Sequence, residues 1–357
     1  MHLRSLLRQL LITAGFFVAW LWLLGQVIRV FYPEDDEAAV DTYRSASPLV
    51  SDAPSIVLYE FDRLRRPADK RMIVLGSSTG MLNLRADHLR PDFPGWDVHN
   101  MAIPTSNMDQ IYQVLDMIIA VSDEQTLDNS VFILPLYYVM FSDRLYGGKD
   151  TPLSVEMLRY GLYRSQEGDT PTPLLGYRFA SVTHGLLRVF LGIDKVSKAV
   201  AGARSDLDAG KPINWGRFRP TIRQPYKYAK KPPDAKFQRS ENARRIKQIG
   251  LPDSMEHGQF ERIEEIADRV LSVGARLIIV DGPVPTWNRG VHFKYYREHK
   301  QSFVAALARK PGVAYFDFTD LLPDDLFGDS AHTMIKGSEK FEDAVAQAIQ
   351  GLRDPIR

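Results

Sequence analysis

The chain has 357 residues, of which 45% are apolar and 25% charged, and its formal net charge is +1. These proportions are typical of a globular protein with a sizeable core, and a charge near zero gives no reason to expect nucleic acid as a partner. The sequence contains no cysteine, which excludes disulfides, thiol catalysis and cysteine-ligated metals. The histidines show no metal-site spacing either, so we expect neither a metal nor a cofactor.

An uncharged apolar stretch over 10–25 lies near the N-terminus. With the next three residues it reaches about the length that a spanning helix needs. Arg4 and Arg8 precede it, and the acidic residues of 33–37 follow it. By the positive-inside rule, we expect 1–32 to form a cytoplasmic tip and a transmembrane anchor. This predicts a single-pass protein of the inner membrane with a periplasmic domain. The alternative is a cleaved signal peptide, against which stand the length of the stretch and the missing small-residue cleavage site.

After a juxtamembrane linker over 33–70, five short apolar runs alternate with segments of helical periodicity. The predicted strands cover 72–75, 96–102, 131–134, 274–280 and 313–318. The predicted helices cover 108–121, 259–273, 294–309 and 335–352. This alternation is typical of βαβ units. It predicts an α/β protein: a three-layer α/β/α domain over 71–357 with a parallel, flavodoxin-like sheet of five strands.

The interval between the third and fourth strands is too long for one crossover, so we expect an inserted cap or subdomain over 140–250. Within it, 154–163 and 179–191 have helical character. The part from 211 to 247 is basic and interleaved with aromatics, with only Asp234 and Glu241 as acidic residues. A solvated face is its default interpretation, and contact with an anionic glycan or lipid headgroups is the alternative.

The first predicted strand ends in the small residues Gly76 and Ser77 and then Ser78. Such positions lie at the carboxyl edge of a parallel sheet, where open α/β sheets bind ligands. Asp329 and His332 follow the fifth strand and therefore belong to the same edge. A serine hydroxyl needs an imidazole as its base, and the imidazole needs a carboxylate to fix its tautomer. We therefore predict Ser78 as nucleophile, His332 as base and Asp329 as its partner.

Two alternatives concern the same turn. Ser77 is expected to be a structural or substrate-binding hydroxyl, but a shift of one residue would exchange it with Ser78. The run from Val74 to Gly80 also resembles the phosphate-binding loop of flavodoxins, in which hydroxyls and N–H groups hold the FMN phosphate. Against that interpretation, Met81 and Leu82 follow where a flavodoxin continues with Asn-Thr, and Asp329 and His332 would have no role.

Gly76-Ser77-Ser78 after a buried strand and Asp329-Ser-Ala-His332 before the last helix together resemble the SGNH (GDSL-type) hydrolase and acyltransferase superfamily. The resemblance covers most of the chain after Arg71 except the insertion. Asn100 falls at the family's second block, and 278–285 is similar to its proline-bearing fourth strand end. The membrane-anchored arrangement is similar to the D-alanyl transfer protein of teichoic acid synthesis and to proteins that O-acetylate alginate.

The resemblance implies an acyl donor delivered by a membrane-bound O-acyltransferase and a polysaccharide or other glycan as acceptor. It also implies an oxyanion hole, for which we predict the Ser78 and Thr105 amides together with Tyr138. Thr105 stands where the family has a glycine, and Tyr137-Tyr138 stands where it has an asparagine. Ser77, Asn100 and Tyr137 are predicted to bind substrate.

The predicted function is that of an extracytoplasmic serine acyltransferase or esterase. It would act on O-acyl groups, O-acetyl groups foremost, of a cell-envelope or exported polysaccharide. The alternative is a degenerate SGNH-type fold without catalysis, which binds glycan or serves as a scaffold for a modification complex. The missing asparagine favours this alternative, and the intact Asp-x-x-His sequence argues against it.

Overall fold

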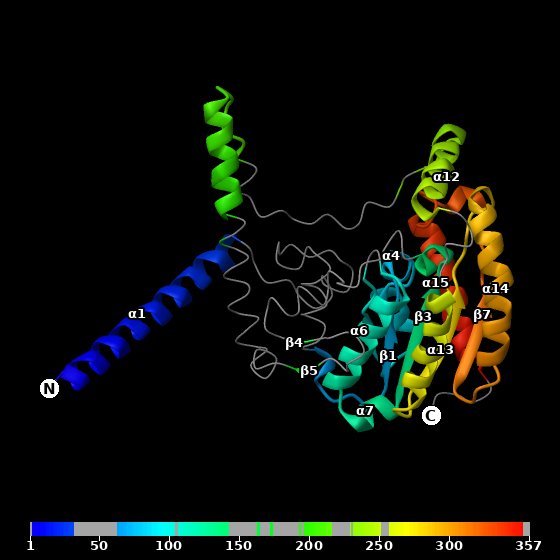
Figure 1. Ribbon diagram of the computed structural model, residues 1–357, viewed down its shortest axis with the longest axis horizontal. Coiled ribbons are helices and arrows are strands. Elements are labelled where there is room, and N and C mark those ends of the chain that lie inside the picture. Colours follow the sequence, from blue (N-terminus) through cyan, green and yellow to red (C-terminus); the bar gives the residue numbers. More distant parts are fainter. Residues whose placement is uncertain are drawn as a thin grey trace. The chain divides into compact units, whose positions relative to one another are not determined.

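A computed structural model describes residues 2–31, 63–103, 106–142, 163–164, 172–173, 193, 196–215, 229, 231–250 and 257–352 (Figure 1). The chain divides into two compact units, which are described separately. The first comprises Met1–Tyr59, Tyr160–Leu162 and Leu174–Tyr226. The second comprises Glu60–Arg159, Tyr163–Pro173 and Lys227–Arg357.

The first unit contains the long apolar helix α1 (His2–Phe31) and a second helix over 196–208. Within α1, the segment Ser5–Gln26 has 22 residues and the composition of a membrane span. At 1.5 Å per residue it is about 33 Å long, enough for a hydrocarbon core of about 30 Å. The helix therefore meets the length and composition of a single transmembrane segment, a test that an N-terminal signal sequence passes as well.

The second unit is built on a sheet of five parallel strands in the order β2-β1-β3-β6-β7. The strands are β1 (Arg71–Val74), β2 (Asp97–Asn100), β3 (Ser130–Leu136), β6 (Arg276–Asp281) and β7 (Val313–Asp317). Each pairs in parallel with its neighbours. The prediction of an α/β fold with a five-stranded parallel sheet is confirmed.

Helices cover both faces of this sheet (Figure 1). One face carries α4 (Ser78–Asn83), α5 (Ala86–Leu89) and α15 (Ile335–Gln350). The other carries α6 (Met108–Val121), α13 (His257–Leu271) and α14 (Val291–Leu307). The short helix α7 (Glu124–Asp128) precedes β3. Alternate residues of the strands face opposite layers, so Met72 and Val74 pack with Phe341 and Val345 of α15 in one buried core.

The third strand extends two residues beyond its predicted end, through Pro135 to Leu136. A proline is unusual inside a sheet because it lacks the N–H that a neighbouring strand would bind. Here the missing N–H would point toward β1, and β1 has already ended: the Leu75 N–H donates to Ile133 O (2.8 Å), and Val74 is the last paired residue. Pro135 therefore removes no hydrogen bond from the sheet.

The insertion is described in part. It contains the two-residue strands β4 (Tyr163–Arg164) and β5 (Thr172–Pro173), and helix α12 (Ala235–Ile249), which belongs to the unit of the sheet. Of the helix predicted over 154–163, only Tyr163 is described, and it lies in β4 rather than in a helix. The helix predicted over 179–191 and the linker up to residue 62 lie outside the described residues.

Two of the charge clusters in the described part of the second unit lie at strand ends. At the amino end of β1, buried Arg71 donates from Nε to Asp97 Oδ2 (2.9 Å) and from its terminal nitrogens to the carbonyls of Leu64 and Arg66. His99 Nε2 lies 2.8 Å from the same Asp97 oxygen. Burial raises the pKa of Asp97, but His99 and Arg71 outweigh burial, and the pKa lies well below its usual range.

The second cluster lies where β6 ends. The Asp281 carboxylate, 2% exposed, accepts hydrogen bonds from the Lys300 ammonium and from the hydroxyls of Tyr296 and Tyr315. Lys300 is 3% exposed, and burial lowers its pKa. Because a lone buried charge is costly, each member of this pair depends on the other.

Candidate active site

The turn after β1 presents Ser78 at the carboxyl edge of the sheet. Gly76 has a φ of +118°, which is strained for residues with a side chain, and Ser77 is the extended N-cap of α4. Ser78 is the first residue of α4. A Cβ on Gly80 would lie 2.8 Å from Leu75 O and 2.9 Å from Pro135 Cγ. Gly76 thus lets the chain turn directly from β1 into α4, and Gly80 lets α4 pack closely against the ends of the strands.

Ser78, His332 and Asp329 form a continuous chain of hydrogen bonds. The Ser78 Oγ lies 2.9 Å from His332 Nε2, and His332 Nδ1 lies 2.8 Å from Asp329 Oδ2. The imidazole tautomer with its proton on Nδ1 satisfies both contacts, because Nδ1 then donates to the carboxylate and Nε2 accepts from the hydroxyl. This is the arrangement in which an imidazole can remove a proton from a serine.

The Asp329 carboxylate is held by its own loop as well as by His332. Its Oδ1 accepts hydrogen bonds from the backbone N–H groups of Ala331 and His332, each at 2.8 Å. Burial raises the pKa of Asp329, but the hydrogen bond and charge of His332 and the two backbone donors outweigh it, so the pKa is lowered. Asp329 is therefore a carboxylate at neutral pH.

The loop that carries Asp329 and His332 is closed by an antiparallel bridge between Phe327 and Thr333. Although β7 lies three strands from β1 in the order of the sheet, the segment after β7 brings this loop to α4. Asn83, at the end of α4, fixes the contact: its Oδ1 accepts from the Thr333 hydroxyl (3.0 Å). Asn83 Nδ2 donates to Ala331 O at 3.4 Å. Helix α4 and the loop with His332 are thus joined by a buried amide.

The structure places Ser77 and Asn100 in supporting positions. The buried Ser77 hydroxyl lies 3.2 Å from Thr79 Oγ1, whereas His332 contacts Ser78, so Ser78 is the serine beside the base. Both hydrogens of the Asn100 amide bind carbonyls of the nucleophile helix region, Gly80 O at 3.0 Å and Leu84 O at 2.7 Å. The Asn100 amide thereby joins β2 to α4 and has no hydrogen left to offer a substrate. Thr105 lies outside the described residues.

The two tyrosines after β3 are buried, and their hydroxyls have protein partners. The Tyr138 hydroxyl donates to Asn288 Oδ1 (3.0 Å), and the Tyr137 hydroxyl donates to Ser330 O (3.0 Å). Asn288 Nδ2 donates to both Ser330 O (2.8 Å) and Tyr137 Oη (3.1 Å). Burial raises the pKa of Tyr138. The hydroxyls of Tyr138, predicted as an oxyanion donor, and of Tyr137, predicted to bind substrate, thus contact Asn288 and Ser330, and their roles toward a substrate stay predictions.

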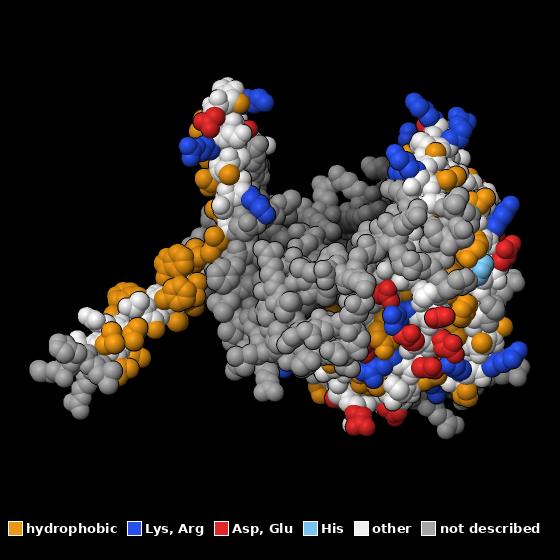
Figure 2. Space-filling view, in the orientation of Figure 1, with side chains coloured by type: hydrophobic (Ala, Val, Ile, Leu, Met, Phe, Trp, Pro, Cys, Tyr) orange, Lys and Arg blue, Asp and Glu red, His pale blue; other side chains and the backbone are white. Residues whose placement is uncertain are grey.

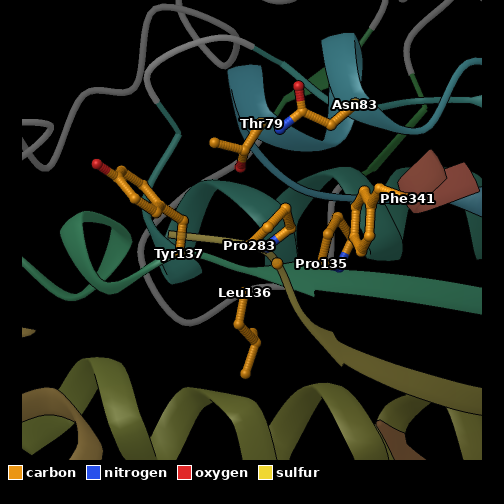
Figure 3. A pocket seen from close by; sticks show the side chains of 8 residues that line it. Thr79, Asn83, Pro135, Leu136, Tyr137, Pro283 and Phe341 are labelled. Atoms are coloured by element: carbon orange, nitrogen blue, oxygen red, sulfur yellow. The ribbon is translucent and has the colours of Figure 1, made fainter. Parts of the chain in front are cut away.

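A small pocket lies between α4 and the ends of β3 and β6 (Figure 3). Thr79 and Asn83 line it from α4, and Tyr137, Pro283 and Phe341 line it from the other elements. Figure 3 shows the Leu136 side chain directed away from the other labelled side chains. The pocket is bounded by the residue that follows Ser78, and most of its wall is apolar.

The sequence prediction missed four residues that hold the site: Asn83, Glu241, Arg245 and Asn288. The Ser330 hydroxyl donates to Glu241 Oε1 (2.8 Å) and accepts from Arg245 Nη2 (3.0 Å). A signal for Glu241 was present, because it is one of two acidic residues in a basic stretch. Asn288 follows the proline-bearing end of β6, at the edge where ligands bind. Nothing in the sequence around Asn83 distinguishes it from an ordinary polar residue of a short helix.

Among the described residues, no group of histidine and carboxylate side chains is arranged to hold a metal ion. Comparison with known proteins names no family: no protein-family model matches the sequence, and no curated protein matches it either. Fold and site geometry are therefore the grounds for function. Together they define an α/β protein with a Ser-His-Asp constellation at the carboxyl edge of its sheet.

Proposed function

We propose that this protein is a serine-dependent acyltransferase or esterase of SGNH type, with Ser78 as nucleophile, His332 as base and Asp329 as its partner. The observation that carries the proposal is the unbroken hydrogen-bond chain from Ser78 Oγ through His332 to Asp329. These residues come from opposite ends of the second unit, and their alignment in the order that acyl transfer needs supports a catalytic role.

In the proposed reaction, Ser78 Oγ attacks an acyl carbonyl carbon while its proton passes to His332 Nε2. The carbonyl oxygen becomes an oxyanion, and the Ser78 N–H is one predicted donor to it, because a first-turn N–H has no partner within its helix. Collapse of the tetrahedral intermediate breaks the bond to the leaving oxygen, which takes the proton from His332. A sugar hydroxyl or water, deprotonated by His332, then attacks the acyl-Ser78 ester and restores the serine.

For the substrate we propose O-acyl groups, O-acetyl groups foremost, on a cell-envelope or exported polysaccharide. This rests on the resemblance of the Ser78 and Asp329-x-x-His332 segments to membrane-anchored SGNH-type acyl-transfer proteins. The same resemblance suggests a membrane-bound O-acyltransferase as the partner that delivers the acyl group.

We further propose that α1 is an uncleaved inner-membrane anchor whose N-terminus is cytoplasmic, which places the second unit in the periplasm. Arg4 and Arg8 before the apolar segment support this orientation. Alkaline phosphatase fused after residue 40 should be active, and an inactive fusion would reverse the orientation. The mass of the mature protein distinguishes the two alternatives, because an anchor keeps the N-terminal residues and a cleaved signal loses them.

The test of the nucleophile uses the full chain in detergent. The wild type should release p-nitrophenol from p-nitrophenyl acetate with an initial burst and should react with a fluorophosphonate probe. Ser78→Ala should abolish both reactions. Ser272→Ala, which changes an exposed serine at the end of α13, should leave both unchanged. Mass spectrometry of the labelled peptide assigns the adduct, and an adduct on Ser77 would move the nucleophile by one residue.

The second candidate function is that of a non-catalytic protein that binds glycan or serves as a scaffold. One observation favours it: the hydroxyls of Tyr137 and Tyr138 and both amide hydrogens of Asn100 have protein partners. A wild-type protein that is folded yet does not react with the fluorophosphonate would support this candidate over catalysis.

A further inference from the structure

Ser330, which lies between the aspartate and the histidine of the candidate triad, is 1% exposed and has partners on both its backbone and its side chain. Its carbonyl accepts from Tyr137 Oη at 3.0 Å and from Asn288 Nδ2 at 2.8 Å. Its hydroxyl donates to Glu241 Oε1 and accepts from Arg245 Nη2. The hydroxyl contacts come from α12, which belongs to the insertion and not to the five-stranded framework.

Glu241 is the residue of α12 on which these contacts converge. It is 6% exposed, whereas α12 presents a basic outer side that includes Lys236, Arg239 and Lys247 (Figure 2). Its carboxylate accepts from Ser330 and from both Arg244 and Arg245. Burial raises the pKa of Glu241, but these hydrogen bonds and charges outweigh it, so the pKa is lowered and the group is ionised at neutral pH.

The Ser330 contacts bear on His332 because hydrogen bonds within the loop couple the two residues. Asp329 Oδ1 binds the backbone N–H groups of Ala331 and His332, and the Phe327–Thr333 bridge closes the loop. A displacement of Ser330 therefore displaces the imidazole relative to Ser78. Asn83 restrains the loop on the side of α4, and Glu241 restrains it on the side of α12.

We propose that Glu241 is a positioning residue, which acts through the Ser330 hydroxyl to hold His332 Nε2 at hydrogen-bond distance from Ser78 Oγ. This inference rests on the proposed acyl transfer for its kinetic consequences. It assigns to α12 a role in setting the rate of the chemical step, separate from any contact between the insertion and a substrate.

The test compares Glu241→Ala with Ser240→Ala in the full-length protein. Ser240 is the neighbouring exposed residue, and its hydroxyl donates to Phe237 O on the same helix. For Glu241→Ala we expect the acylation burst to slow by about 10²-fold, the loss associated with a misplacement of about 1 Å. The KM for p-nitrophenyl acetate should stay close to that of the wild type, because Glu241 does not contact the substrate. Ser240→Ala should not change either quantity.

Two further variants separate positioning from a loss of folding. Ser330→Ala removes the side-chain link to α12 and leaves the ion pairs of Glu241 with Arg244 and Arg245 in place. It should slow the burst in a protein that stays folded, with a urea midpoint lowered only by the loss of the Ser330 hydroxyl hydrogen bonds. Glu241→Gln keeps an oxygen that accepts from Ser330, and it should retain more of the rate than Glu241→Ala.

Deuterium exchange of the peptide that covers 328–334 gives a readout that does not depend on activity. Both Glu241→Ala and Ser330→Ala should raise its deuterium uptake. Unchanged uptake in both variants, or an unchanged burst in Ser330→Ala, would overturn the positioning role while leaving the nucleophile intact. A wild type that shows no burst and no labelling would instead refute the proposed acyl transfer, and the exchange measurement would still decide whether Glu241 holds the loop.

Discussion

The substitution Asp329→Asn tests the role of the carboxylate with almost no change in shape. Asp329 Oδ1 accepts two backbone N–H groups, and only an oxygen can accept them. The asparagine oxygen must therefore occupy the Oδ1 position, which places its NH₂ group against His332 Nδ1. That nitrogen then has to accept, and the imidazole proton moves to Nε2. His332 in this tautomer cannot accept the Ser78 proton.

A wrong tautomer in a Ser-His-Asp triad lowers kcat by about 10⁴-fold. At 1.36 kcal/mol for each tenfold change, this corresponds to about 5.5 kcal/mol of lost transition-state stabilisation. The urea midpoint should stay close to that of the wild type, because both backbone hydrogen bonds of the loop are kept. The control is Asp325→Asn, an exposed aspartate of the same segment.

The assay is the burst of p-nitrophenol together with the rate of fluorophosphonate labelling, measured on protein whose folding has been checked by urea denaturation. Asp325→Asn should match the wild type in both. An Asp329→Asn protein that retains its burst rate within about tenfold would refute the reasoning, since the tautomer argument requires a loss of several powers of ten.

Three other predictions concern stability, each measured as the free energy of unfolding in urea. Gly80→Ala should lose about 1–3 kcal/mol from overpacking, because the new Cβ meets Leu75 O at 2.8 Å, and an unchanged midpoint would contradict that contact. Lys300→Ala should lose about 3–5 kcal/mol by leaving Asp281 buried without its cation. A loss below about 1 kcal/mol, the range of exposed ion pairs, would contradict this dependence of Asp281 on Lys300. Since the pKa of Asp97 is lowered on folding, its ionisation stabilises the fold above about pH 4 and this contribution is lost as the pH falls further. Asp97→Asn should make the free energy of unfolding fall less steeply below about pH 4. An equally steep fall in this variant would assign the pH dependence to other groups.

The sheet was predictable because most of its strands are short runs of apolar residues, and the alternation with helices leaves few other arrangements. Ser78 and the Asp329-His332 pair were predictable as neighbours for the same reason, since parallel strands present their carboxyl ends at one edge. The hydrogen-bond partners of the two tyrosines after β3 could not be predicted in this way. Their hydroxyls are taken by Asn288 and Ser330, partners distant in the sequence whose proximity depends on how the loops cross the edge.

The sequence also does not distinguish side chains that could contact a substrate from side chains that hold the site together. Asn100 has the residue type and position of a substrate ligand, yet its amide binds the carbonyls of Gly80 and Leu84. Glu241 has no motif around it and lies in a segment that favours a solvated interpretation. Its contact with Ser330 depends on which side of α12 is buried, and a helix of weak amphipathicity does not specify this.

The separation of Ser78 from His332 along the chain, 254 residues, has a consequence for biosynthesis. The N-terminal part of a chain is synthesised first, so the segment with Ser78 leaves the ribosome long before the one with His332. Until α15 has docked and brought the last loop to α4, the serine has no base and is chemically an ordinary alcohol. Partly made or truncated chains therefore carry Ser78 without the imidazole, and the hydrogen-bond chain of the candidate site exists only when synthesis is almost complete.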